Sequence, residues 1–133
     1  MSARTPRPLV GLTVLVVDDH RDTVDMLREY LDSAGATVVG ADSAKTALAF
    51  AETHVLDVVL VDLHMPGEDG WWFLRELRTS RVVSAASVPV FAITGERHDL
   101  PDDPASGFAG YFLKPIALDA LVAALAPLPR RRS

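Results

Sequence analysis

Five side chains in this sequence are of the types that handle phosphoryl groups. Each follows a short apolar run: Asp18 and Asp19 after LTVLVV, Asp62 after DVVLV, Thr94 at the end of VPVFAIT, and Lys114 after GYFL. Clustered carboxylates repel one another and are tolerable together only with a cation. Oxygen ligands suit Mg²⁺, while an ammonium and a hydroxyl would add charge neutralisation and a hydrogen bond. Such a set would hold a phosphoryl group, and one aspartate could itself be the nucleophile, giving an aspartyl phosphate.

The elements that must position these groups alternate along the chain. We expect strands at 12–17, 37–40, 57–61, 88–93 and 110–113. Three of them, at 12–17, 57–61 and 88–93, are apolar runs typical of strands buried on both faces of a sheet, and the other two are shorter. Amphipathic segments with helical spacing separate most of them. The alternation predicts an α/β fold, a doubly wound five-stranded parallel sheet. In the flavodoxin-like strand order 2-1-3-4-5, the first and third strands are neighbours, so Asp18, Asp19 and Asp62 would meet in one crevice.

The connection between the fourth and fifth strands departs from this alternation. A helix is expected there, but Pro101, Pro104 and Gly107 are unfavourable inside one and the apolar spacing is poor. We therefore expect a shortened or irregular fourth helix.

The composition bounds the class of protein. The 133 residues, 49% hydrophobic and 23% charged, suit one globular domain. The chain has no cysteine, which excludes disulfides, thiolate metal sites and cysteine nucleophiles. The net charge of −5 argues against direct nucleic-acid binding. No segment is long enough to span a bilayer, and the run 9–17 reads as a strand better than as a signal peptide, so we expect a cytoplasmic protein without a membrane partner.

Four motifs, in this order along the chain, carry a family resemblance. They are LVVDDH (15–20), VDLHMPGEDG (61–70), ITGE (93–96) and GYFLKP (110–115). Together they resemble the receiver domain of two-component response regulators. The resemblance implies a receiver domain at 10–126, with a flexible lead-in at 1–9 and a solvated tail or linker start at 127–133.

The resemblance implies a metal site and a phosphorylation site. Asp62 would be the phosphoacceptor. Asp19 would bind Mg²⁺ directly, with Asp18 assisting through water. Asp62 and the main-chain carbonyl of His64 would complete the protein ligands. His20, which follows the aspartate pair, reads as a surface residue.

The remaining motif residues acquire roles in the same way. Thr94 would bond a phosphoryl oxygen after phosphorylation, and Lys114 would pair with the same group. Tyr111 matches an aromatic switch that turns inward when Thr94 moves. Pro115 matches a proline that is usually preceded by a cis peptide bond in the family.

The function implied is a phosphorylation-dependent signalling switch and not an enzyme acting on other substrates. A sensor histidine kinase or histidine phosphotransfer protein would donate the phosphoryl group, and a downstream protein would bind near residues 95–126. We expect a monomer or weak dimer, either stand-alone or cut from a larger chain.

Two other classes use related sites. A haloacid-dehalogenase-like Mg²⁺ phosphatase needs a second aspartate two residues after the nucleophile, where this chain has His64. A flavodoxin-like FMN binder needs a Ser/Thr/Gly-rich loop where this chain has Asp18 and Asp19, which would repel phosphate unless a metal intervened.

Overall fold

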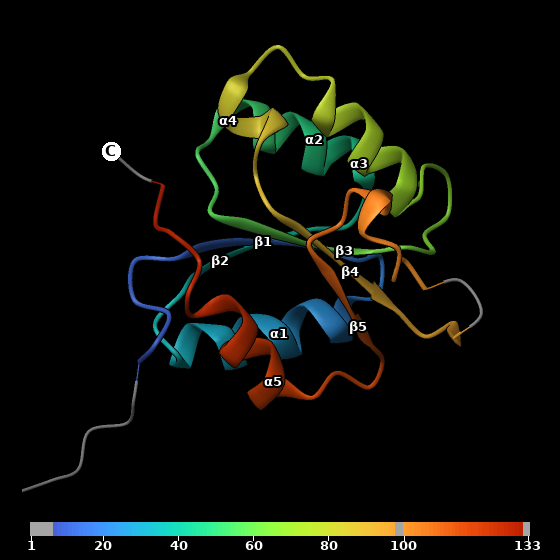
Figure 1. Ribbon diagram of the computed structural model, residues 1–133. Helices are drawn as coiled ribbons and strands as arrows, with labels where there is room; N and C mark the ends of the chain where they lie inside the picture. The colour runs from blue at the N-terminus through green and yellow to red at the C-terminus, as the bar shows by residue number, and fades with distance from the viewer. Residues whose placement is uncertain (1–6, 98–99, 132–133) are drawn as a thin grey trace, which may run out of the picture.

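The protein folds as a five-stranded parallel sheet with helices on both faces (Figure 1). The computed structural model describes residues 7–97 and 100–131. The strand order is β2-β1-β3-β4-β5, which confirms the predicted doubly wound topology. The strands are β1 (Thr13–Val17), β2 (Thr37–Ala41), β3 (Val58–Asp62), β4 (Val90–Thr94) and β5 (Gly110–Leu113).

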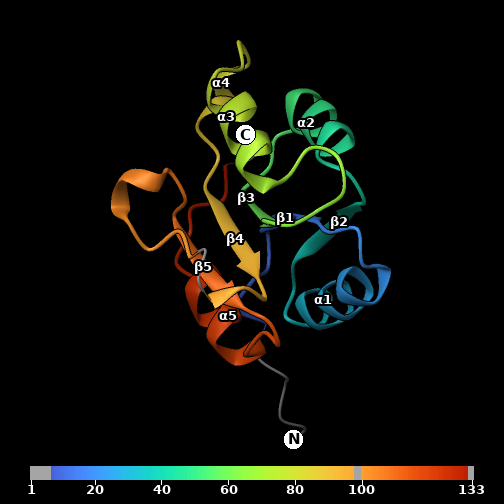
Figure 2. The same cartoon turned by 90° about the vertical axis from the view of Figure 1, so that its right-hand side faces the viewer.

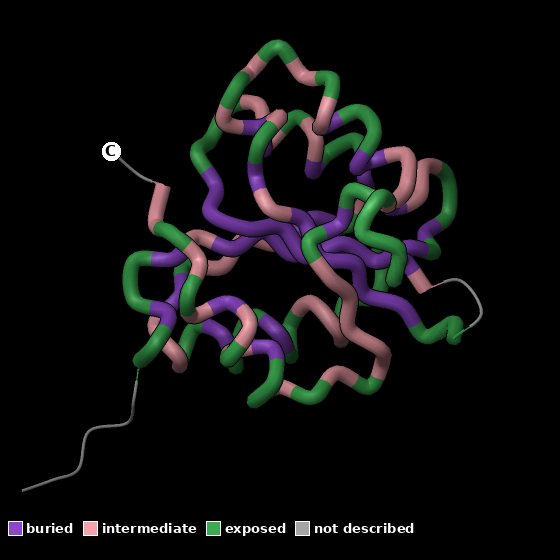
Figure 3. Tube along the Cα trace, in the orientation of Figure 1, coloured by how far each residue is buried: buried purple, intermediate pink, exposed green. Residues whose placement is uncertain are grey.

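The three central strands are buried because both of their faces are apolar. Figure 3 shows this buried band through the middle of the molecule. Alternate β1 residues enter two separate cores: Leu15 and Val17 face one, and Val14 and Val16 face the other. Continuous apolar sequence is what a strand covered on both sides requires. The sheet is therefore a rigid base from which the ends of its strands project.

The helices form two layers. Helices α1 (Arg21–Ser33) and α5 (Leu118–Leu125) cover one face, and α2 (Ala44–Thr53), α3 (Gly70–Arg78) and the short α4 (Val83–Ala86) cover the other (Figure 2). Among the residues that the structure describes, no helix is long and apolar enough to cross a membrane.

Helix α3 begins directly against the end of β3. Asp69 caps it, with a side-chain oxygen accepting from the backbone N–H of Trp72 at 2.9 Å. A Cβ atom on Gly70 would lie 2.6 Å from the backbone oxygen of Asp62. Only glycine permits this approach, so Gly70 lets the helix start beside the strand end that carries Asp62.

The connection between β4 and β5 is irregular, as predicted. Within the described residues of 95–109 there is no α-helix, and a 3₁₀ turn lies at Pro104–Ser106. Gly107 follows in the left-handed conformation at φ +92°. Phe108 is buried and meets Trp71 edge-on, with ring centroids 5.0 Å apart. One aromatic contact therefore holds the end of this connection where a helix was expected.

Residues near both ends of the described chain pack against the folded domain, which the sequence interpretation did not predict. Leu9, assigned to the flexible lead-in, is fully buried, and its backbone N–H donates to Ala34. Arg130, expected to be solvated, donates to the backbone oxygens of Pro8 at 2.8 Å and Val10 at 3.2 Å. For Leu9 and Arg130 the expectations were wrong, because the leucine is buried in the core and the arginine has carbonyl acceptors. Residues 1–6 and Arg132 lie outside the described residues, and the domain bounds stay a prediction.

Arg131 joins the two helix layers around the amino edge of the sheet. Its backbone N–H donates to the buried carboxylate of Asp57, just before β3. Its guanidinium donates to Leu56 O at 3.3 Å, Ser84 O at 2.9 Å and Ser87 Oγ at 2.7 Å. In Figure 1 the red C-terminal segment rises past the sheet from α5 toward α4. Hydrogen bonds of Arg131 thus connect the segment after α5 to α4 and to the start of β3, so Arg131 is part of the folded domain and not of a solvated tail.

Arg131→Ala should lower the free energy of unfolding by about 2 kcal/mol, because three side-chain hydrogen bonds are lost. Urea denaturation measures it. Arg81→Ala, at an exposed arginine, is the matched control and should change stability by about 0.5 kcal/mol or less. Equal effects of the two substitutions would show that the Arg131 hydrogen bonds contribute nothing to the free energy of unfolding.

Amide hydrogens of the β4–β5 connection should exchange much faster than those of β3 or β4, since few N–H groups of its described residues donate to backbone oxygens. Hydrogen exchange with mass spectrometry on peptides covering 95–107 tests this. Protection equal to that of the central strands would contradict the irregular connection.

Candidate functional site

The predicted site residues come together at the carboxyl edge of the sheet. Asp18 follows β1 and Asp62 ends β3, and these strands are neighbours with Val17 paired to Val61. Lys114 follows β5, where its backbone N–H donates to the backbone oxygen of Thr94 at 2.8 Å. The strand register therefore delivers an ammonium group to two carboxylates that are far from it in sequence.

Lys114 bridges the two buried carboxylates. Its Nζ lies 2.9 Å from Asp18 Oδ2 and 3.2 Å from Asp62 Oδ2. Asp18 and Asp62 are only 1% and 3% exposed. Buried like charges so placed require neutralisation, and the ammonium supplies part of it.

The surroundings shift the pKa values of the three groups in different directions. Burial and the nearby charge of Asp18 raise the pKa of Asp62, against the lowering effect of a hydrogen bond from the His64 N–H. Burial also acts to raise the pKa of Asp18, but hydrogen bonds from the His20 N–H and from Lys114 outweigh it and lower that pKa. Burial opposes the charge of Lys114, but the two carboxylates outweigh it and raise the ammonium pKa. Of the two buried carboxylates, Asp62 is therefore the one whose pKa is raised.

Four residues offer ligand atoms to a cation at this edge. One atom from each of Asp18, Asp19, His20 and Asp62 lies within 4.8 Å of the other three. Asp19 has a partly exposed side chain, so its carboxylate faces the opening of the site. Oxygen donors and excess negative charge fit a small, hard divalent ion such as Mg²⁺. The residues present therefore fit the metal that the sequence predicted.

His20 belongs to the cluster, which the sequence interpretation missed. Its Nδ1 lies 3.0 Å from Asp18 Oδ1, 3.5 Å from Asp19 Oδ1 and 3.9 Å from Asp62 Oδ2. Its side chain is 63% exposed, as expected for a surface residue, but the sequence interpretation did not predict its contacts with the three carboxylates. Its place directly after the aspartate pair, at the start of α1, was the signal that could have found it.

The structure also places the three other predicted residues, Thr94, His64 and Tyr111. The buried Thr94 hydroxyl accepts from the Glu96 N–H at 3.0 Å. His64 is exposed, and its backbone N–H donates to Asp62 Oδ1 at 3.0 Å. Tyr111 lies on β5 beside Ala92 and packs partly buried against the core. The family-based roles of these three residues remain predictions, whereas the Lys114–Pro115 bond is cis, as predicted.

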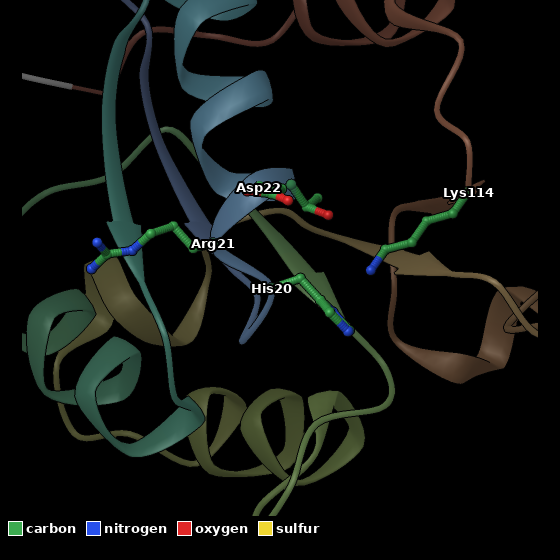
Figure 4. Close-up of a pocket in the computed structure, with 5 residues that line it drawn as sticks. His20, Arg21, Asp22 and Lys114 are labelled. Atoms are coloured by element: carbon green, nitrogen blue, oxygen red, sulfur yellow. The ribbon is translucent and has the colours of Figure 1, made fainter.

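A pocket of about 490 Å³ opens beside the cluster, lined by His20, Arg21, Asp22, Thr23 and Lys114. Figure 4 shows His20 and Lys114 extending toward each other from opposite sides. The pocket thus presents an imidazole and an ammonium to solvent beside the carboxylate cluster.

The sequence matches the response regulator receiver domain family over residues 14–126, most of the chain. The chain belongs to this family. Receiver domains are signalling domains of two-component systems, and they interact with histidine kinases and phosphotransfer proteins. The alternative of a haloacid-dehalogenase-like phosphatase is not supported.

The curated relatives that this chain matches include longer proteins. It is 36% identical to the virulence sensor protein BvgS of Bordetella pertussis, a match covering 90% of this chain and 10% of BvgS. It is 32% identical to the virulence transcriptional regulatory protein PhoP of Salmonella typhimurium, a match covering 92% of this chain and 54% of PhoP. The chain thus spans about a tenth and about half of these proteins.

Solved receiver structures share the fold. The chemotaxis response regulator CheY4 of Vibrio cholerae superposes with a TM-score of 0.75 at 29% identity, covering 86% of this chain and 95% of that one. The receiver domain of sensor histidine kinase PA1611 from Pseudomonas aeruginosa, solved with magnesium in its active-site cleft, gives 0.77 at 25% identity, covering 87% and 95%.

Asp62→Asn should raise the free energy of unfolding in EDTA at pH 7 by roughly 1 kcal/mol, because it removes a buried charge. Because the pKa of Asp62 is raised in the folded state, ionisation of this group lowers the free energy of unfolding as pH rises through that pKa. The gain should therefore vanish below about pH 4, where the unfolded aspartate is also protonated.

Urea titrations of the wild type and Asp62→Asn at both pH values measure this gain. Asp102→Asn, at an exposed aspartate, is the control and should show no gain. A loss of stability in Asp62→Asn at pH 7 would contradict the electrostatic account.

Proposed function

We propose that this receiver domain is a signalling switch that accepts a phosphoryl group on Asp62 from a phosphohistidine of a sensor histidine kinase or histidine phosphotransfer protein. The supporting observation is the position of Asp62: a buried carboxylate at the end of β3, held by the Lys114 ammonium and beside two further aspartates. Burial and the nearby charge of Asp18 raise its pKa, and phosphorylation would move the negative charge from this buried carboxylate to the phosphoryl oxygens.

The transfer is a displacement at phosphorus. A carboxylate oxygen of Asp62 forms the new O–P bond, the N–P bond to the donor imidazole breaks, and the imidazole leaves with the bonding electrons and takes up a proton. The Lys114 ammonium lies close enough to Asp62 to form an ion pair with the phosphoryl oxygens after transfer. The Thr94 hydroxyl would exchange its bond with the Glu96 N–H for one with the phosphoryl group.

Asp18, Asp19, Asp62 and the main-chain carbonyl of His64 would hold Mg²⁺. When bound, the ion neutralises the carboxylates and the charge that develops on the transferring oxygens. The PA1611 receiver, with magnesium in its cleft, supports this assignment by likeness.

The output follows from the same site. Thr94 ends β4, and its movement toward the phosphoryl group would reach the irregular connection and Tyr111, so a downstream protein would bind the face near residues 95–126. The domain catalyses only its own phosphorylation and dephosphorylation. We propose a cytoplasmic monomer or weak dimer that contacts proteins and not nucleic acid.

Incubation with Mg²⁺ and acetyl phosphate or phosphoramidate, followed by intact mass measurement, tests the proposal. The wild type should gain one alkali-labile phosphoryl group, and Asp62→Asn should gain none. Asp102→Asn should behave as the wild type, and EDTA should prevent labelling of both. Labelling of Asp62→Asn equal to the wild type would contradict the assignment.

A further inference from the structure

We propose that the His20 imidazole is a ligand of the metal site, through Nδ1, and that it biases the site toward Mn²⁺, Co²⁺ and Zn²⁺ relative to Mg²⁺. This rests on the proposed metal-assisted function but concerns a residue outside the oxygen ligands assigned above. The starting observation is that Nδ1 faces three carboxylates at 3.0, 3.5 and 3.9 Å.

The 3.0 Å contact between His20 Nδ1 and Asp18 Oδ1 is a hydrogen bond, which coordination of Nδ1 to an ion would replace. The three separations are also compatible with atoms that share one ion. Two ligands about 2.1 Å from an octahedral ion stand about 3.0 Å apart when adjacent and about 4.2 Å apart when opposite. The three distances from His20 Nδ1 fall within this interval. The widest separation in the four-residue cluster is bounded by 4.8 Å, so a contraction of at most about 0.6 Å would bring that separation to the distance between opposite ligands.

The backbone fixes His20 while leaving its ring adjustable. The His20 N–H donates to Asp18 Oδ1 at 2.9 Å, and its carbonyl accepts from Thr23 and Val24 at the start of α1. The side chain is 63% exposed on the wall of the 490 Å³ pocket, opposite Lys114 (Figure 4). The ring is therefore anchored beside the carboxylates with solvent space in which to turn.

The ligand type determines the preference. Imidazole nitrogen suits borderline transition ions, whereas Mg²⁺ strongly prefers oxygen. Coordination needs Nδ1 as the unprotonated nitrogen, which the Nε2–H tautomer of the neutral ring provides. Lys114 occupies the Oδ2 side of Asp18 and Asp62, leaving Oδ1 of Asp18 and Asp19 next to the imidazole.

The decisive experiment is pulsed electron paramagnetic resonance of the full chain loaded with Mn²⁺. The wild type should show modulation from a directly coordinated histidine nitrogen. His20→Ala should lose it. His54→Ala, at an exposed histidine outside the carboxylate cluster, should keep it and is the control. In metal titrations, His20→Ala should weaken Co²⁺ binding by about tenfold with little change for Mg²⁺.

Absence of nitrogen modulation in the wild type, or its retention in His20→Ala, would overturn the proposal. Acetyl phosphate labelling of Asp62 with Mg²⁺ is measured on the same samples. If labelling succeeds without a nitrogen signal, the histidine ligand is wrong and the phosphorylation switch stands. If Mn²⁺ does not bind and Asp62 is not labelled, both are wrong.

Discussion

The repulsion between the buried carboxylates of Asp18 and Asp62 is the constraint on which the rest of this structure depends. Two acidic side chains, each almost fully excluded from solvent, lie at the ends of adjacent strands and share one ammonium group. Such an arrangement costs stability, and a protein keeps it only where the surrounding structure is rigid enough to impose it. The two apolar cores on either side of the sheet provide that rigidity.

Several local features serve to hold the charges in place. Lys114 reaches the carboxylates because the Thr94 carbonyl fixes the start of its segment to the end of β4. Gly70 allows α3 to begin against the Asp62 backbone. At the opposite edge, Arg131 and Asp57 join the two helix layers. Arg131 thus connects the two layers at the edge away from the site. The described residues of the β4–β5 connection, beside the site, make few backbone hydrogen bonds.

Sequence patterns predicted the features that depend on periodicity and strand ends. Uninterrupted apolar runs indicated β1, β3 and β4, and the strand order then predicted that Asp18, Asp19 and Asp62 would meet. Prolines indicated the irregular connection. The patterns missed contacts made by single residues. Leu9 packs into the core from a segment without periodicity, and Arg131 finds its acceptors only in three dimensions. The contacts of His20 depend on a ring orientation that residue type alone does not set.

The central claim is that one particular carboxylate receives the phosphoryl group. Borohydride reduction of the phosphorylated protein converts an aspartyl phosphate to homoserine, and peptide sequencing by mass spectrometry then locates the altered residue. The account predicts homoserine at position 62 and at no other aspartate. Homoserine at position 18 or 19, or an intact Asp62 in protein shown to carry the phosphoryl group, would contradict it.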